Sequence, residues 1–178
     1  MSIKTNWYII TGAPCAGKTK VVKRLASLGY KTTPEVPRIL INREINKGKT
    51  IKEIRKNEAR FQRKVLQMKI KIENKIPVSQ ITFLDDGGIP GSIAYYRLTG
   101  LNLGLAIKEA KKRKYKGVFF LKRLSYKKDY ARIEDKKTAR KLNKLLYETY
   151  RNLKYKVVMV PVKPVKERVE FILERTGL

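Results

Sequence analysis

The sequence has 178 residues, 42% of them hydrophobic, which suits one α/β domain and is too short for two ordinary ones. It contains no histidine and only one cysteine, Cys15, which excludes an internal disulfide, a His-dependent catalytic triad and a His/Cys metal cluster. No run approaches 18 apolar residues and the opening residues enter a strand pattern at once, so we expect a cytoplasmic protein with no membrane contact and no signal peptide.

The charge is strongly one-sided. Lys and Arg number 43 against 15 Asp and Glu, a formal charge of +28. A field of this sign attracts nucleic acid and makes the binding salt-sensitive. The alternative is a compositional bias, although such a bias usually raises Lys and Glu together, and here 29 Lys face 11 Glu. Nucleic acid therefore stays a candidate partner, and the basic segment 108–128 is either a nucleic-acid patch or a solvated face.

Strand patterns alternate with helix patterns along the chain. The alternation predicts βαβ units, and hence an α/β fold with a parallel sheet and helices on both faces. A Gly-rich loop is expected at 87–91 and a charged surface flap at 124–135. Short β-rich runs predict strands at 7–11, 30–33, 81–84, 118–121 and 157–160, and helical spacing predicts helices at 18–28, 38–47, 49–75, 92–98, 108–115, 138–153 and 165–175.

A phosphate-binding loop is the strongest motif. Residues 12–19 (GAPCAGKT) fit the pattern GxxxxGK followed by Ser or Thr, with a strand before it and a helix after it. Its backbone N–H groups can surround an anion, Lys18 reaches the β- and γ-phosphates, and the Thr19 hydroxyl binds Mg²⁺. Cys15 is more simply a loop filler than a catalytic thiol, because no base is identifiable beside it. We expect nucleotide contacts from Gly12, Ala13, Pro14, Cys15, Ala16, Gly17, Lys18, Thr19 and Lys20.

A pair of carboxylates ends the third predicted strand. Asp85 and Asp86 follow the hydrophobic run 81–84, which suits the metal-side acid of a phosphate-loop site. The spacing leaves open which aspartate faces the metal and which, if either, orients an acceptor hydroxyl. We assign Mg²⁺ to Thr19 and Asp86, and we take Lys18 and both aspartates as catalytic candidates.

With these motifs, the sequence resembles a small P-loop ATPase/kinase-like family related to the ribosylnicotinamide-kinase domain of the bacterial NAD regulator. The resemblance rests on the opening YIITGAPCAGKT, on TPEVPR at 33–38, on DGGIPGSIAYY at 86–96 and on the segment 155–172. It implies a P-loop three-layer sandwich whose five-stranded sheet has the kinase-type order 2-3-1-4-5. We expect one nucleotide-binding domain over residues 1–178.

The resemblance also implies functions for residues away from the loop. It implies a lid around 122–135 whose arginine closes over the phosphates, with Arg132 as the first candidate and Arg123 as the second. Arg132 could instead form a plain surface ion pair with a neighbouring acid. Glu35 and Arg38 would bind the phosphoryl acceptor, against the simpler reading of a helix-start acid and a solvated base.

The expected function is a Mg·ATP-dependent phosphotransferase, a kinase, with GTP not excluded as the donor. The acceptor would be a nucleoside, a nucleotide or a nucleic acid. Gly87 and Gly91 stand where the family carries an arginine and an aspartate, both of which would face the acceptor. This departure supports an alternative, a P-loop NTPase coupled to nucleic-acid binding without an acceptor. A third possibility is a basic RNA-binding module whose nucleotide site serves stability.

Overall fold

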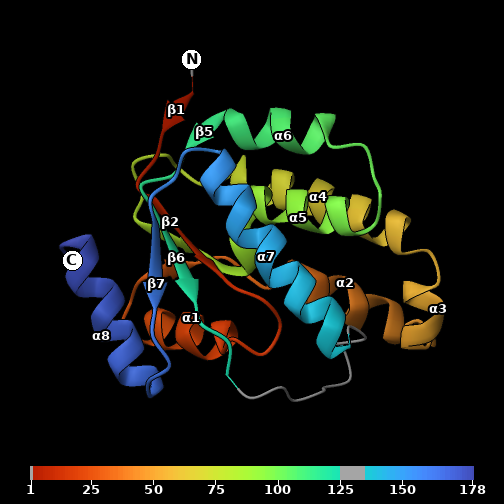
Figure 1. Cartoon of the computed structure of the whole chain (residues 1–178), viewed down its shortest axis with the longest axis horizontal. Coiled ribbons are helices and arrows are strands. Elements are labelled where there is room, and N and C mark those ends of the chain that lie inside the picture. The colour runs from red at the N-terminus through yellow and green to blue at the C-terminus, as the bar shows by residue number, and fades with distance from the viewer. Residues whose placement is uncertain (1, 125–134) are drawn as a thin grey trace.

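The computed structural model describes residues 2–124 and 135–178 and shows a central parallel sheet with helices on both sides (Figure 1). The order of the sheet is β3-β4-β2-β6-β7, which is 2-3-1-4-5 when its strands are counted along the chain. Every neighbouring pair of strands is parallel. The predicted fold class and sheet order are therefore confirmed. The strands are β2 (Trp7–Thr11), β3 (Lys31–Thr32), β4 (Thr82–Leu84), β6 (Gly117–Leu121) and β7 (Val157–Val160).

Helices follow the strands as the sequence pattern predicts, with boundaries that differ by a few residues. The last helix, α8 (Val165–Thr176), and the first, α1 (Lys18–Ser27), pack on each other. The others are α2 (Val36–Ile45), α3 (Ile51–Arg55), α4 (Glu58–Glu73), α5 (Gly88–Leu98), α6 (Gly104–Lys111) and α7 (Lys136–Asn152), and a 3₁₀ turn, η1 (Asp85–Gly87), follows β4.

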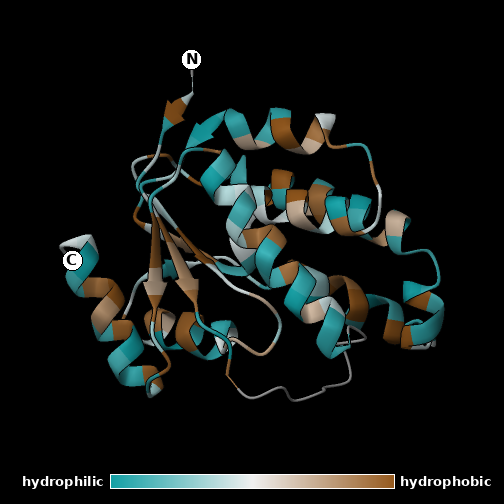
Figure 2. Cartoon of the chain, in the orientation of Figure 1, coloured by the Kyte–Doolittle hydropathy of each residue, from teal (hydrophilic) through white to brown (hydrophobic). Residues whose placement is uncertain are grey.

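Alternate residues of the central strand β2 build two separate cores. Tyr8 and Ile10 join the core under α1 and α8, whereas Trp7 and Ile9 join the core under α5 and α7. This division follows from the two-residue period of a strand, because successive side chains point to opposite faces of the sheet. Hydrophobic residues accordingly follow the strands and the inner helix faces, and hydrophilic residues cover the outside (Figure 2). The sheet is covered on both faces, as a parallel sheet requires.

The helix predicted at 49–75 is wrong as a single helix. The structure divides it into α3 and α4, because two local capping signals interrupt the apolar stripe. Thr50 and Glu53 form a capping box at the start of α3, and the Asn57 side chain accepts the Arg60 N–H at the start of α4. An N-cap side chain satisfies an otherwise orphan N–H group, so it stabilises a fresh helix start at this point.

The Gly-rich loop predicted at 87–91 is also wrong, because α5 already begins at Gly88. A carboxylate from elsewhere makes this early start possible. Glu73, the last residue of α4, accepts the Ile89 N–H at 2.7 Å and the Tyr115 hydroxyl at 2.7 Å. Burial raises the pKa of Glu73 despite these two donors. The last residue of α4 thus caps the distant helix α5, which a local pattern does not reveal.

A second, two-stranded sheet lies beside the first. It pairs β1 (Ile3–Lys4) in parallel with β5 (Arg113–Lys114), and Figure 1 shows it above the main sheet. The helix predicted at 108–115 instead spans Gly104–Lys111, so its last residues belong to β5. Within residues 2–124 and 135–178, no helix is both long and apolar enough to cross a lipid bilayer.

Candidate functional site

The phosphate loop connects β2 to α1 at the carboxyl edge of the sheet. Its backbone turns through positive φ angles at Gly12 (137°), Cys15 (67°) and Gly17 (80°). A Cβ atom on Gly12 would lie 2.7 Å from the Leu121 carbonyl oxygen, so only glycine fits there. Within residues 2–124 and 135–178, no side chain caps the N-terminus of α1, and its first turn contains no acidic residue. Its N–H groups are therefore free to bind an anion, as the motif predicts.

The loop lysine lies against the loop itself. The Lys18 ammonium donates to the carbonyl oxygens of Gly12 (2.7 Å) and Ala13 (3.3 Å). Lys20, two residues further along α1, is exposed and makes no side-chain hydrogen bond or ion pair within the described parts of the chain. The motif's other side chains are small and mostly buried, so the backbone is the surface that the loop offers to a ligand. Buried loop residues are Gly12, Ala13, Pro14, Cys15 and Ala16.

Glu35 connects the phosphate loop to α2. Its Oε2 atom accepts the Thr19 hydroxyl and the Arg38 Nε–H, both at 3.1 Å. Glu35 is at the N-cap position of α2, yet its side chain makes no capping hydrogen bond there. Glu35 therefore stands at a helix start, as the simpler interpretation predicts, but its carboxylate contacts Thr19 instead of the helix N-terminus. The two acceptor candidates thus lie beside the magnesium candidate of the loop.

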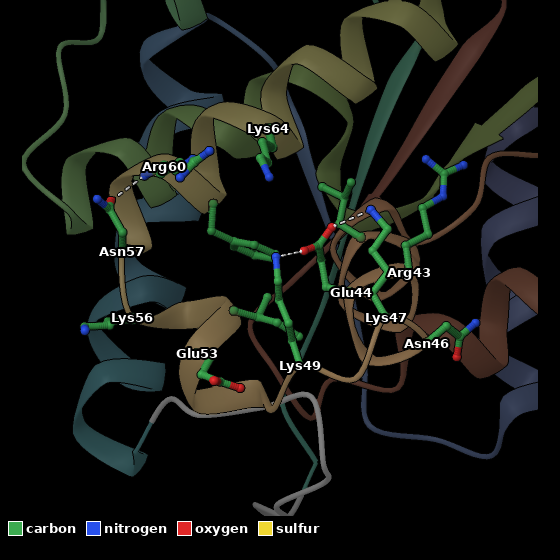
Figure 3. A pocket seen from close by; sticks show the side chains of 13 residues that line it. Arg43, Glu44, Asn46, Lys47, Lys49, Glu53, Lys56, Asn57, Arg60 and Lys64 are labelled. Atoms are coloured by element: carbon green, nitrogen blue, oxygen red, sulfur yellow. Dashed lines mark hydrogen bonds and ion pairs between the residues drawn. The ribbon is translucent and has the colours of Figure 1, made fainter.

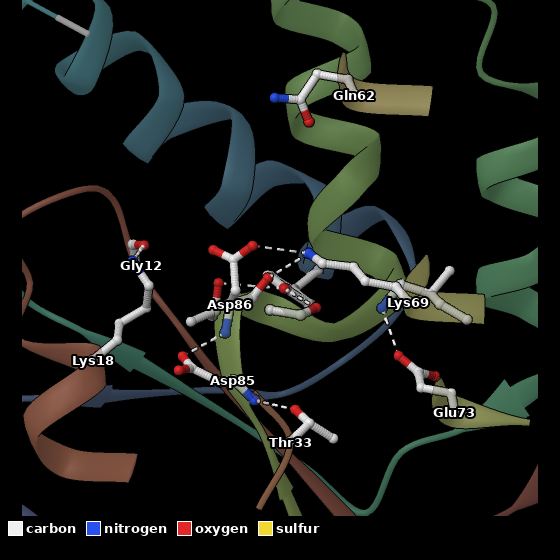
Figure 4. A network of polar contacts seen from close by, with 12 residues as sticks. Gly12, Lys18, Thr33, Gln62, Lys69, Glu73, Asp85 and Asp86 are labelled. Atoms are coloured by element: carbon white, nitrogen blue, oxygen red, sulfur yellow. Dashed lines mark hydrogen bonds and ion pairs between the residues drawn. The ribbon is translucent and has the colours of Figure 1, made fainter. Parts of the chain in front are cut away.

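The two aspartates lie next to the loop because β4 pairs with β2. Asp85 is 5% exposed, and its Oδ1 atom accepts the Asp86 N–H at 2.6 Å. Its own N–H donates to the Thr33 hydroxyl at 2.8 Å. Burial raises the pKa of Asp85 to about 7, the nearby Asp86 charge adds to this shift, and Lys18 opposes it. The charge of Lys18 therefore acts on the Asp85 carboxyl, while the neighbouring Asp86 carboxylate lies against Lys69 (Figure 4).

Asp86 is held by a lysine that the sequence analysis missed. The Lys69 ammonium lies 3.1 Å from Asp86 Oδ2 and donates to the Asp86 carbonyl oxygen at 2.8 Å (Figure 4). The two side chains are 4% and 10% exposed, so this ion pair is buried. Asp86 also has a left-handed backbone (φ 51°), which two contacts from one ammonium help to fix. A signal existed, because Lys69 continues the four-residue row of Phe61 and Val65 on the buried face of α4.

The glycines at 87 and 91 are enforced by packing. Gly87 has φ 75°, and a Cβ atom there would lie 2.5 Å from the Tyr150 hydroxyl oxygen. That hydroxyl donates to the Gly87 carbonyl oxygen at 2.8 Å. A Cβ atom on Gly91 would lie 3.0 Å from the Asp86 carbonyl oxygen. The arginine and aspartate of the resembling family therefore have no space here without a rearrangement around Tyr150.

A second residue that the sequence analysis missed stabilises the phosphate loop from behind. Arg168 of α8 is 1% exposed and donates to the carbonyl oxygens of Ala16 (2.6 Å), Pro161 (2.9 Å) and Lys122 (3.1 Å). Its guanidinium thus joins the loop, the end of β6 and the segment before α8. The sequence places it in an ordinary amphipathic helix, where a buried arginine has no local signature.

The lid arginines are only partly described. Arg132 lies outside the described residues, as does most of the lid predicted around 122–135. Arg123 is within them, two residues after the end of β6, and its Nε atom is buried without a hydrogen-bond partner in the part of the chain that the structure describes. The next residue, Leu124, donates its N–H to the Cys15 carbonyl oxygen at 3.0 Å. The start of the predicted lid therefore lies against the phosphate loop.

The residues around the loop fit a magnesium-bound nucleotide. Among the described residues, no three Asp, Glu or Cys side chains gather as a self-sufficient metal cage. Mg²⁺ on a triphosphate needs none, because phosphate oxygens and water supply most of its ligands. The Thr19 hydroxyl and the Asp85 carboxyl can supply oxygen ligands to a metal ion at the edge of the loop. A cation bound there would favour the ionised form of Asp85.

Comparison with known proteins agrees with this arrangement. A family model described as AAA domain matches residues 7–168, and the chain belongs to that family. No curated protein matches the sequence. Solved structures with the same fold include a NadR protein in complex with NR, at 16% identity and a TM-score of 0.73 over 98% of this chain. The resemblance to the NAD regulator is thereby confirmed. This chain spans about half of that protein, 51% of its length.

Two further similar structures match over nearly their whole length. Deoxyadenosine kinase from M. mycoides has 16% identity and a TM-score of 0.68, with 96% of this chain and 98% of that chain covered. Thymidylate kinase from Ehrlichia chaffeensis has 14% identity and a TM-score of 0.66, with 98% and 100% covered. At such identities the similarity establishes the fold, and the chemistry has to be argued from the site.

Proposed function

We propose that this chain is a phosphotransferase, a kinase that moves the γ-phosphoryl group of Mg·ATP to a nucleoside, nucleotide or nucleic-acid acceptor. One observation carries the proposal. An uncapped helix N-terminus with Lys18 lies beside two carboxylates, because β2 and β4 are neighbours in the sheet. Phosphoryl transfer needs positioning and charge neutralisation more than covalent chemistry, and this edge offers both. Residues 1–178 would act as one nucleotide-binding domain, with a lid around 122–135.

The donor side would be formed by the loop. Its amides and Lys18 would bind the phosphates, and Arg123, with Arg132 of the lid, would add positive charge. Mg²⁺ would neutralise charge on the β- and γ-phosphates. We infer that Thr19 and Asp85 hold the metal, since the Asp86 carboxylate is already paired with Lys69, whereas the charge of Lys18 acts on Asp85. This inference replaces Asp86, the aspartate assigned to the metal from the sequence.

Asp86 would then serve the acceptor. Its carboxylate would take the proton of the attacking hydroxyl, whose oxygen forms the new bond to the γ-phosphorus. The bond from that phosphorus to the β–γ bridging oxygen breaks, and ADP leaves. Lys69 would hold Asp86 in place, and Glu35 and Arg38 would bind the acceptor beside Thr19.

A second function has its own observation. The space that the resembling family gives to an arginine and an aspartate is filled here, because Gly87 and Gly91 pack on Tyr150 and Asp86. A site with little space on its acceptor side would suit a P-loop NTPase coupled to nucleic-acid binding, because such an enzyme needs room only for water. Water would replace the acceptor hydroxyl, and free phosphate would be the product.

A label-transfer assay separates these functions. The protein is incubated with γ-labelled ATP or GTP, Mg²⁺ and a panel of nucleosides, nucleotides and oligonucleotides, with Lys18→Ala as the background control. A kinase moves label to one class of acceptor, and the transfer disappears in Lys18→Ala. Release of free phosphate alone, stimulated by an oligonucleotide, would establish the NTPase instead. Absence of both activities at millimolar nucleotide would refute both proposals.

A further inference from the structure

A pocket of about 980 Å³ lies between the second half of α2, the short helix α3 and the first half of α4 (Figure 3). Its apolar lining comes from Leu40, Ile54 and Phe61. Phe61 belongs to the small core between α2 and α4, and Leu40 and Ile54 pack against that core. The pocket is large enough for a ligand group of nucleotide size. None of its lining residues is among the nucleotide contacts assigned above.

The rim of this pocket is strongly basic. Six of its lining residues are Lys or Arg, and two are Glu. Glu44 is already paired with Lys47 (3.2 Å) and with Lys49. These partners, Lys49 first, lower the pKa of Glu44 to about 2. Glu53 is occupied by the capping box at the start of α3. Neither acid is therefore left to neutralise the remaining bases.

Four exposed cations on the rim make no side-chain hydrogen bond or ion pair within residues 2–124 and 135–178. Lys64 is directed from α4 toward Glu44, across the space between the helices (Figure 3). Like charges gathered around a hollow repel one another, and a bound anion relieves that repulsion. A ligand for this pocket should thus combine negative charge for the rim with an uncharged part for the apolar lining. The four cations are Arg43, Lys56, Arg60 and Lys64.

Two helices connect the pocket to the phosphate site. The α2 helix follows Glu35, whose carboxylate contacts Thr19, and Leu40 comes five residues later, about 7.5 Å along the helix. The α4 helix carries Lys69, which contacts Asp86, and Lys64 lies five residues before it, again about 7.5 Å away along the axis. The pocket therefore lies alongside the place where an acceptor would meet Asp86, within reach of a short oligonucleotide.

We propose that this pocket binds a single-stranded nucleic acid, with phosphates on the basic rim and a base on the apolar lining, and that the strand's terminal nucleotide is the acceptor. Single-strand binding sites combine a basic groove with apolar or aromatic contacts to bases, which is the composition found here. A simple nucleoside would leave the rim cations without a partner. The inference rests on the proposed phosphotransferase for the role of the terminus, although the binding itself is independent of transfer.

The test is fluorescence anisotropy with a labelled single-stranded decanucleotide at several salt concentrations. Arg60→Glu/Lys64→Glu is compared with Lys71→Glu/Lys75→Glu, a control with the same spacing and charge change in the last turn of α4 and just after it. All four residues are exposed. We expect the pocket variant to weaken binding at least about 10-fold and to reduce the slope of log K against log salt by about 2. The control should lose no more than about threefold, as expected when only the general field changes.

Other outcomes would overturn the inference. They are equal losses in both variants, an unmeasurable affinity of the wild-type protein at low salt, or displacement of the oligonucleotide by a polyglutamate peptide at equal charge concentration, which would indicate an acidic protein partner. The panel assay keeps the two proposals apart. Transfer to mononucleosides but not to oligonucleotides would leave the kinase and remove the strand terminus as its acceptor. Pocket-dependent oligonucleotide binding without transfer to any acceptor would do the reverse.

Discussion

The donor side and the acceptor side of this site are built in different ways. The donor side comes from consecutive residues, 12–19, whose shape follows from glycines at fixed positions and from one lysine. The acceptor side is assembled from α2, α4, η1 and α7, and its central contacts are the pairs Lys69–Asp86 and Tyr150–Gly87. The comparison teaches that the motif of the phosphate loop is written in consecutive residues, whereas the proposed acceptor side depends on how distant helices pack. The predictions that follow test this contrast.

The largest effect is expected on the donor side. Lys18→Ala should lower kcat/KM for transfer or hydrolysis by about 10³-fold, because it removes the ammonium that would stabilise charge on the phosphates. It should also abolish the rise in melting temperature that Mg·ATP produces. Lys23→Ala, an exposed residue on the same helix, is the control and should change neither measurement. If Lys18→Ala retained nucleotide-dependent stabilisation and activity, the donor site would be misassigned.

The buried ion pair of the acceptor side should matter for both stability and rate. Lys69→Met leaves Asp86 charged and unpaired, so we expect a loss of about 3–5 kcal/mol in the free energy of unfolding, measured by urea denaturation. Lys69→Met/Asp86→Asn removes both charges and should recover most of that loss. Transfer should stay at least about 10²-fold below wild type in the double variant, since the proton acceptor is missing. Wild-type transfer in the double variant would dismiss Asp86 from catalysis.

The crowding at Gly87 can be separated from its backbone conformation. Gly87→Ala should destabilise the protein more than Gly29→Ala, because both glycines have positive φ but a Cβ atom on Gly29 meets nothing within 4 Å. The positive φ alone costs about 1–2 kcal/mol, and the clash with the Tyr150 hydroxyl should add about 1–3 kcal/mol. Adding Tyr150→Phe to Gly87→Ala should relieve part of the excess. Equal losses at the two glycines would mean that the site has room for a side chain.

The smallest effect is expected at the helix boundary beside the pocket. Asn57→Ala should cost about 1 kcal/mol in chemical denaturation, because the Arg60 N–H loses its cap. Asn152→Ala, exposed near the end of α7, is the control and should stay within about 0.5 kcal/mol of wild type. A stabilised Asn57→Ala variant with more helical circular dichroism would show that the long helix predicted at 49–75 is accessible to this sequence.

The parts of the fold that local patterns specify were predicted well. All five strands of the main sheet were predicted, four of them as short, apolar, β-rich runs and β3 within the run 30–33, and the phosphate loop was predicted from its motif. Local sequence patterns do not determine which strands lie side by side, so the order of the sheet was predicted from the family resemblance instead. The elements missed were those with partners far away, such as β1 with β5 and the Glu73 cap of α5.

The candidate site divides along the same line. Glu35 and Arg38 were proposed from a motif, and the structure adds that Glu35 contacts Thr19. Lys69 and Arg168 were missed, because each acts on a backbone that is distant in sequence. Lys69 had a usable signal, a charged residue within an apolar helix row, while Arg168 had none. A buried cation that binds backbone carbonyl oxygens can be recognised only when the structure shows where those carbonyl groups lie.

The position of Arg168 sets a minimum length for any working fragment. A chain cut before α8 would keep every residue of the phosphate-loop motif and the whole five-stranded sheet, yet the Ala16 carbonyl would lose its donor. The loop would then have to keep its curvature without support from the opposite end of the sequence. Under the proposed function, nucleotide affinity would depend on the last fifteen residues as well as on the first twenty, so a design that transplants the loop should carry α8 with it.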